Sequence, residues 1–159
     1  MSSLPYAFEV GAQEPCFEYV THAPTDAIVD ALPAHPGQVL RDGGRRPMLL
    51  HFAPRRWLAP APDTALMARL NALAARGQGA LVDVEGKWRR VLVEGPGAAQ
   101  ALASTISVEA VLRDRECAAV SLFDCPAILA RQGGAFDLWV AASYLDHFVG
   151  ATRNLRLPP

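Results

Sequence analysis

Residues 79–98 read GALVDVEGKWRRVLVEGPGA, and this stretch decides the fold. Two apolar runs, Gly79 to Val84 and Trp88 to Val93, flank the polar residues Glu85-Gly86-Lys87, which is the pattern of a β-hairpin. Gly95-Pro96-Gly97 then closes the second run and opens a short helix, because proline in the first helical turn loses no hydrogen bond. The segment therefore predicts two antiparallel strands followed by a helix.

The sequence before this segment repeats the same order. Met48 to Phe52 and Trp57 to Ala59 are short apolar runs separated by a turn at Pro54, which again predicts a hairpin. Pro62-Asp63 then offers a helix N-cap, three leucines follow at helical spacing, and Gly77 stands where a left-handed residue ends a helix. We therefore expect a second strand–strand–helix unit.

After the short helix, three further strands are expected in succession: Cys117 to Phe123, Ala127 to Arg131 and Phe136 to Ala141. Ser143, followed three residues later by Asp146, has the form of a capping box and predicts a last helix. Hairpins that alternate with helices indicate an α+β fold with antiparallel sheets, and not the βαβα order of a parallel sheet.

Residues 1–45 hold five prolines among polar residues and show no lasting apolar period, which predicts a mostly irregular N-terminal arm. Residues 46–153 are expected to form a single α+β domain, and residues 154–159 a frayed tail. A chain of 159 residues is the usual size of one domain.

Composition limits the classes of partner. Lysine and arginine number 15 against 16 acidic residues, so the net charge of −1 provides no field that would attract nucleic acid or an anionic membrane. No apolar run is long enough for a membrane helix, and the N-terminus lacks the pattern of a signal peptide, so we expect a cytoplasmic location. Because 51% of residues are hydrophobic and only 19% charged, a homodimer is plausible for the isolated chain.

No catalytic centre or metal site is expected on this chain. The three cysteines lack metal or redox spacing and are interpreted as small buried hydrophobes, and the four histidines, among them His51 in an apolar strand, lack ligand spacing. Asp83 is either a functional carboxylate or the polar end of a strand, whereas Asp124 and Asp137 are interpreted as turn and strand-edge residues. The dinucleotide fingerprint and the Walker loop are both absent, which disfavours an independent oxidoreductase.

Arginine doublets beside tryptophan are the candidate interface. They comprise Arg55, Arg56, Trp57, Arg89 and Arg90. Such residues could bind nucleic acid or an acidic cofactor, but the balanced charge favours an interface with a protein, where arginine and tryptophan are common anchors.

Four segments resemble the gamma subunit of heterotetrameric sarcosine oxidase. The runs Gly79 to Val84 and Val91 to Ala98 look like the V-D-V strand and the G-P-x-A strand end that this family shares with the folate-binding domain of aminomethyltransferases. Phe52 to Pro60 is similar to a G-P-x-x-W-L segment, and Ser143-Tyr144-Leu145 to the closing S-F-x-x-Y-L helix. The sequence departs from the pattern at Glu85, where serine is usual.

The resemblance implies a fold of two intertwined ββαβββα-like halves. It also implies a complex in which alpha and beta subunits carry FAD, FMN and NAD, with tetrahydrofolate accepting the one-carbon unit as sarcosine is oxidised to glycine and hydrogen peroxide. The gamma subunit is expected to hold no cofactor and to contribute contacts. The alternative is a free-standing folate-binding protein, for which Asp83, Trp88 and Trp139 are the candidate residues for tetrahydrofolate.

Overall fold

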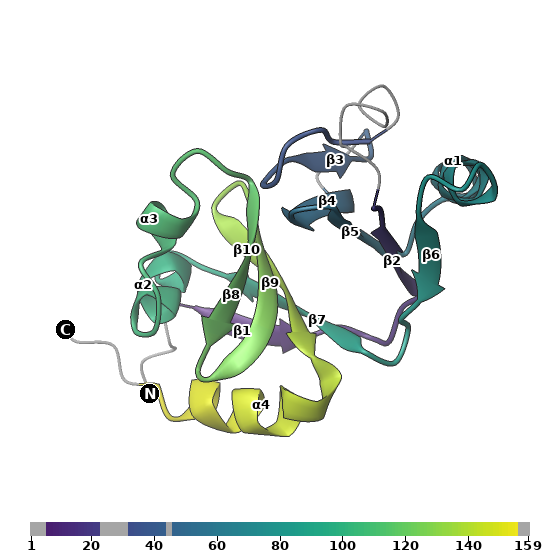
Figure 1. Cartoon of the computed structure of the whole chain (residues 1–159). Helices are drawn as coiled ribbons and strands as arrows, with labels where there is room; N and C mark the ends of the chain where they lie inside the picture. The colour runs from purple at the N-terminus through teal and green to yellow at the C-terminus, as the bar shows by residue number, and fades with distance from the viewer. Residues whose placement is uncertain (1–5, 23–31, 44–45, 156–159) are drawn as a thin grey trace.

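The computed structural model describes residues 6–22, 32–43 and 46–155, and these form two five-stranded antiparallel sheets (Figure 1). The first sheet has the strand order β1-β7-β10-β9-β8. Its strands are β1 (Ala7–Val10), β7 (Trp88–Glu94), β8 (Cys117–Leu122), β9 (Cys125–Gln132) and β10 (Ala135–Ala141).

The second sheet has the order β3-β4-β5-β2-β6. Its strands are β2 (Cys16–Val20), β3 (Val39–Arg41), β4 (Pro47–Ala53), β5 (Arg56–Pro60) and β6 (Ala80–Asp83). Both predicted hairpins of the N-terminal two-thirds lie within one or two residues of the observed strands, but β6 and β7 do not pair with each other. Instead β6 joins the second sheet and β7 the first, so the Glu85-Gly86-Lys87 turn connects two sheets.

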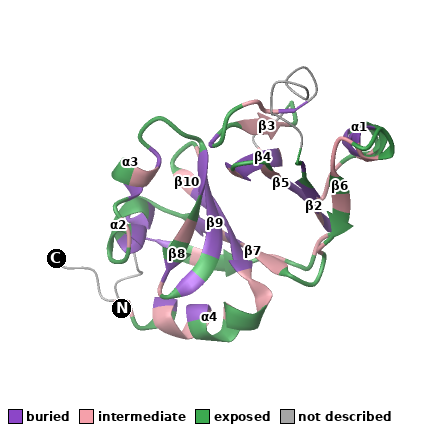
Figure 2. Cartoon of the chain, in the orientation of Figure 1, coloured by how far each residue is buried: buried purple, intermediate pink, exposed green. Residues whose placement is uncertain are grey.

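Helices cover the outer faces of the two sheets (Figure 1). The helix α1 (Thr64–Ala75) packs on the second sheet through Leu66, Leu70 and Leu73, as its leucine spacing predicts. The first sheet is covered by α2 (Ala98–Ala103), α3 (Val108–Val111) and α4 (Leu145–Arg153). A third apolar cluster lies between the sheets and contains Cys16, Leu50, Phe52, Leu58, Cys117, Ile128, Ala130 and Trp139. Figure 2 shows the resulting burial along β9 and β5.

The two sheets belong to two intertwined halves. The first half runs β1-β2-β3-β4-β5-α1 and the second runs β6-β7-α2-α3-β8-β9-β10-α4. Each half gives its first strand to the sheet of the other half, because β1 pairs with β7 and β6 pairs with β2. This arrangement confirms the antiparallel α+β class and the intertwined halves that the resemblance implied.

The arm predicted to be mostly irregular, residues 1–45, contains strands where the structure describes it. Three strands lie there, and β2 pairs on both sides, with β5 and with β6. Pro15 lies just before β2, and its carbonyl accepts a hydrogen bond of 2.7 Å from the backbone of Ala61. This proline therefore marks the start of β2. Residues 1–5 and 23–31, and 156–159 of the predicted tail, lie outside the described residues.

The helix ends agree with the sequence in α1 and differ in α4. Asp63 caps α1 by accepting a hydrogen bond of 2.7 Å from the backbone of Leu66, and Gly77 is left-handed with φ 71°. The capping box predicted at Ser143 is wrong, because a 3₁₀ turn (Ala142–Tyr144) precedes α4 and no side chain caps it. Asp146 still lies in the first turn, where a carboxylate interacts favourably with the helix dipole.

Candidate functional site

Glu18 is a carboxylate buried on β2 at the edge of the space between the sheets, only 4% exposed. It accepts hydrogen bonds from Arg56 at 2.5 Å, from Lys87 at 2.7 Å and from the indole N–H of Trp88 at 3.0 Å. Burial alone would raise the pKa of Glu18, but these three donors outweigh it and the pKa is lowered. Glu18 is therefore an ionised structural group held by three donors of the same chain, and a poor general acid.

Asp137 on β10 is the second buried carboxylate and is not a strand-edge residue, contrary to the sequence interpretation. It is wholly buried in the middle of the first sheet and pairs with Arg90 of β7 at 2.6 Å. Burial raises the pKa of Asp137, and the neighbouring Arg90 guanidinium opposes that rise. The alternation of polar and apolar residues along one strand cannot predict this ion pair, because Arg90 lies on a different strand from Asp137.

The predicted interface residues do not form one exposed rim. Trp57 is wholly buried: its indole N–H donates to the Pro33 carbonyl at 3.0 Å, and its ring stacks on His51 with centroids 4.2 Å apart. Its assignment to an exposed interface is therefore wrong. A large aromatic ring contributes most to stability when it is completely removed from water. Trp57 therefore stabilises the apolar cluster under α1.

The four arginines of that prediction have different environments. Arg56 and Arg90 bind the buried carboxylates Glu18 and Asp137, and Arg89 donates to the Gly11 carbonyl at 2.9 Å. Arg55 is exposed in the β4–β5 turn with φ 60°. Three of them therefore hold the fold together, and a role for any of them in binding a partner stays a prediction.

The candidate folate residues are only partly brought together. Trp88 and Trp139 line the same hollow between the sheets, but its volume is about 10 Å³, which is at the limit for one water molecule. Asp83 does not line it; it is exposed at the end of β6 and accepts a hydrogen bond of 2.9 Å from the backbone of Glu85. Asp83 thus acts as a turn residue, and this geometry gives the tetrahydrofolate alternative no support.

The three cysteines are buried and unpaired, as the sequence predicts. Burial raises the pKa of the Cys16 and Cys117 thiols to about 12 and also raises that of Cys125. Thiols in this state are poor nucleophiles. Over residues 6–22, 32–43 and 46–155, no group of three or more metal-ligand side chains occurs, and no helix is long and apolar enough to cross a membrane.

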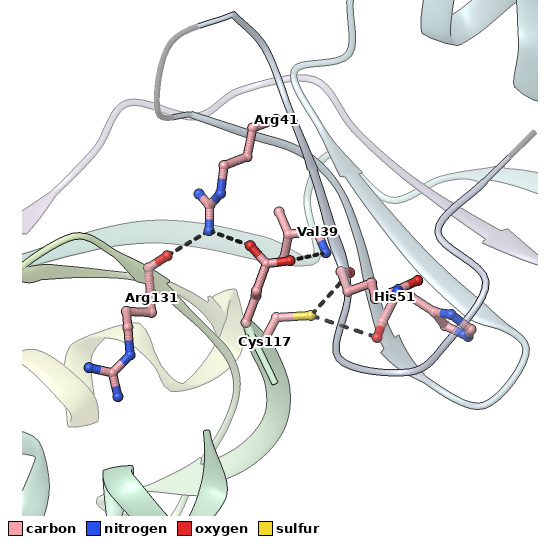
Figure 3. A network of polar contacts seen from close by, with 7 residues as sticks. Val39, Arg41, His51, Cys117 and Arg131 are labelled. Carbon is pink, nitrogen blue, oxygen red and sulfur yellow. Dashed lines mark hydrogen bonds and ion pairs between the residues drawn. The ribbon is translucent and has the colours of Figure 1, made fainter. Parts of the chain in front are cut away.

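A polar junction joins the two sheets and was missed by sequence reasoning (Figure 3). The Gly37 carbonyl accepts backbone hydrogen bonds from Glu116 at 2.8 Å and from Cys117 at 3.1 Å. The Glu116 carboxylate in turn accepts from the backbone of Val39 at 3.2 Å. Because these contacts join residues nearly 80 positions apart, no local pattern in the sequence predicts them.

Arginine side chains surround this junction. Arg41 donates to the Arg131 carbonyl at 2.7 Å and lies 3.6 Å from the Glu116 carboxylate. The Arg131 guanidinium points away from this network (Figure 3), toward Glu109 at 3.2 Å. Beside them lies a hollow of about 630 Å³, here called the junction hollow, lined by Arg41, Arg115, Glu116, Arg131, Gln132, Gly133 and Gly134.

The chain was compared with known proteins at the levels of sequence and structure. No protein-family model and no curated protein sequence matches it. Among solved structures it is similar to a chain of the heterotetrameric sarcosine oxidase from Corynebacterium sp. U-96 in complex with pyrrole 2-carboxylate. The similarity has a TM-score of 0.75 with 23% sequence identity, and it covers 92% of this chain and 81% of that chain.

The chain has the fold of a sarcosine oxidase chain. This result agrees with the family that the four sequence segments resemble, and it extends the likeness beyond the segment from Leu49 to Val149 in which they lie. At 23% identity the similarity establishes the architecture, because one fold can serve several functions.

Proposed function

We propose that this chain is a non-catalytic, gamma-type subunit of a heterotetrameric complex that oxidises sarcosine. The observation that carries the proposal is the similarity to a chain of heterotetrameric sarcosine oxidase over 92% of the chain. In this proposal alpha and beta subunits hold FAD, FMN, NAD and tetrahydrofolate, and the complex works in the cytoplasm. The present chain contributes a contact surface for the other subunits.

The side chains of this chain support a structural role. Its buried carboxylates, Glu18 and Asp137, are bound by cations of the same chain, and its thiols are protonated. These groups stabilise the fold and are poorly placed for proton transfer or nucleophilic attack.

The edges of the sheets offer surface for a partner. Val10 on β1 is 37% exposed and Val82 on β6 is 45% exposed, and each strand is the edge of its sheet. An edge strand presents unpaired backbone groups, so it is a natural place for another chain to add contacts. These two strands are also the ones exchanged between the halves, and we propose them as docking edges.

The proposal is tested by isolating the complex from the native host through an affinity tag on this chain. We expect other polypeptides to co-purify, with the absorbance of bound flavin and with sarcosine-dependent formation of hydrogen peroxide. Substitution of Val82 by lysine should reduce the yield of flavin, whereas the same substitution of Ala103, an exposed position at the end of α2, should not. A colourless chain without co-purifying polypeptides would contradict the proposal.

A further inference from the structure

One guanidinium of the junction hollow is held in place without being neutralised. The side-chain carbons of Arg115 lie directly against Gly37: a Cβ atom at Gly37 would come within 2.7 Å of Cγ of Arg115. Gly37 also has φ 99°, a conformation in which side chains are strained. The stem of the exposed Arg115 therefore packs against Gly37, while its guanidinium has no hydrogen bond or ion pair with the described residues.

A second fixed cation faces the same hollow. Arg41 is anchored by the Arg131 carbonyl at 2.7 Å, so its position does not depend on a ligand. The acidic lining residue, Glu116, already lies 3.6 Å from Arg41 and accepts the Val39 N–H. Arg131 pairs with Glu109 at 3.2 Å, so among the three lining arginines Arg115 is the cation without an ion pair to the described residues.

The remaining wall of the hollow is a turn of two glycines. Gly133 and Gly134 connect β9 to β10, and their N–H groups make no backbone hydrogen bond within the described residues. No heavy atom lies within 4 Å of the place where a Cβ would stand on either glycine, so a ligand can approach the backbone. Consecutive N–H groups in such turns form concave sites for anions.

We propose that the junction hollow binds a small phosphate-bearing molecule, with Arg115 as its anchor. A guanidinium binds two phosphate oxygens at once, and the glycine N–H groups supply donors for another oxygen. The volume of about 630 Å³ lies within the usual range for small-molecule sites, and lining glycines whose N–H groups make no backbone hydrogen bond within the described residues favour a small ligand over an acidic protein segment. This inference does not depend on the proposed function.

The test uses the whole chain and inorganic pyrophosphate as the probe. We expect pyrophosphate to bind in isothermal titration calorimetry at low ionic strength, and to shift the amide signals of Gly133 and Gly134 in NMR spectra. Arg115→Gln keeps the stem that packs on Gly37 but removes the charge, so it should fold normally and weaken binding by about tenfold or more. Arg113→Gln, which changes the same charge at an exposed position outside the hollow, is the matched control.

Three results would overturn the proposal. The first is the absence of amide shifts at Gly133 and Gly134 at about 10 mM pyrophosphate, a concentration at which even weak sites fill. The second is an equal loss of affinity in the Arg113 and Arg115 variants, which would mean that only net charge matters. The third is Arg115-dependent binding of a hexaglutamate peptide without binding of pyrophosphate, which would make the hollow a surface for acidic proteins.

Discussion

Glu18 and Lys87 form a hydrogen bond of 2.7 Å although they stand 69 positions apart. Glu18 lies on β2 of the second sheet, and Lys87 lies in the connection that carries the chain from β6 to β7 in the first sheet. The pair therefore fixes the point at which the second half of the molecule passes between the sheets.

Loss of the Glu18 carboxylate should destabilise the protein more than loss of one of its partners. Glu18→Gln removes the charge that Arg56, Lys87 and the Trp88 N–H share, and it should lower the free energy of unfolding by about 2 kcal/mol. Lys87→Ala should cost less than about 1 kcal/mol, because this side chain is 46% exposed and water replaces the interaction. Urea denaturation measures both, and equal losses would show that Glu18 is not the centre of the cluster.

Stability should fall as pH falls below about 6.5 because of His51. The ring is 1% exposed, its nitrogens make no hydrogen bond within the described residues, and burial lowers its pKa, although nearby carbonyls of Pro33 and His35 oppose part of this shift. The unfolded chain then binds a proton that the folded chain does not, so acid favours unfolding. By pH 5.5 the loss should reach at most about 1.4 kcal/mol.

The variant His51→Phe isolates this effect, because it keeps a ring against Trp57 and cannot bind a proton. Its free energy of unfolding should change less between pH 7.5 and 5.5 than that of the natural chain. An identical pH dependence in both proteins would assign the loss to other groups. Below about pH 4.5 both proteins should weaken further as the Glu18 carboxylate, whose pKa is lowered by its hydrogen bonds, takes up a proton.

The thiols should be unreactive in the folded protein. Cys16 and Cys117 lie in the cluster between the sheets, and burial raises their pKa to about 12. Ellman's reagent should therefore modify these two cysteines rapidly only after denaturation, and their slow rate under native conditions should follow the opening of the sheets. Rapid modification of either residue in the folded chain would contradict the placement of this cluster.

The β8–β9 turn should be stabilised by glycine at one position and destabilised at its neighbour. Phe123 and Asp124 both have left-handed backbone, with φ 50° and 61°. Asp124 is exposed, so Asp124→Gly should raise the free energy of unfolding by about 0.5–1 kcal/mol. Phe123→Gly should instead lower it, because the Phe123 ring packs against Phe148 with centroids 5.6 Å apart. Thermal unfolding compares the two, and a gain in both would mean that this ring contact contributes little.

The elements that could be predicted from sequence are those with a local signal. The leucine stripe and the Asp63 cap of α1, the runs that became β4 to β10, and the glycine at the end of α1 all agree with the structure. The strand β2 was missed because Glu18 interrupts its apolar run, and distant residues, Lys87, Arg56 and Trp88, explain why a carboxylate is buried there.

The candidate site depends on long-range pairing and was less predictable. Adjacent arginines and tryptophan suggested a rim at residues 55–57, but β5 directs Trp57 into the core under α1 and Arg56 toward Glu18. The junction around Gly37 and Arg115 joins segments with no shared local pattern. The alternation of polar and apolar residues along a strand predicts which residues share a face of the sheet. The topology of the sheets decides which other residues that face contacts.

Native mass spectrometry of the tagged chain, isolated from its host, decides whether the chain is a subunit of an oxidase. We expect the chain of 17.1 kDa in a complex with other polypeptides and with bound flavin, and we expect sarcosine to reduce this flavin. A mass corresponding to the chain alone, or to multiples of it without another polypeptide, would contradict the claim that it is a subunit of an oxidase.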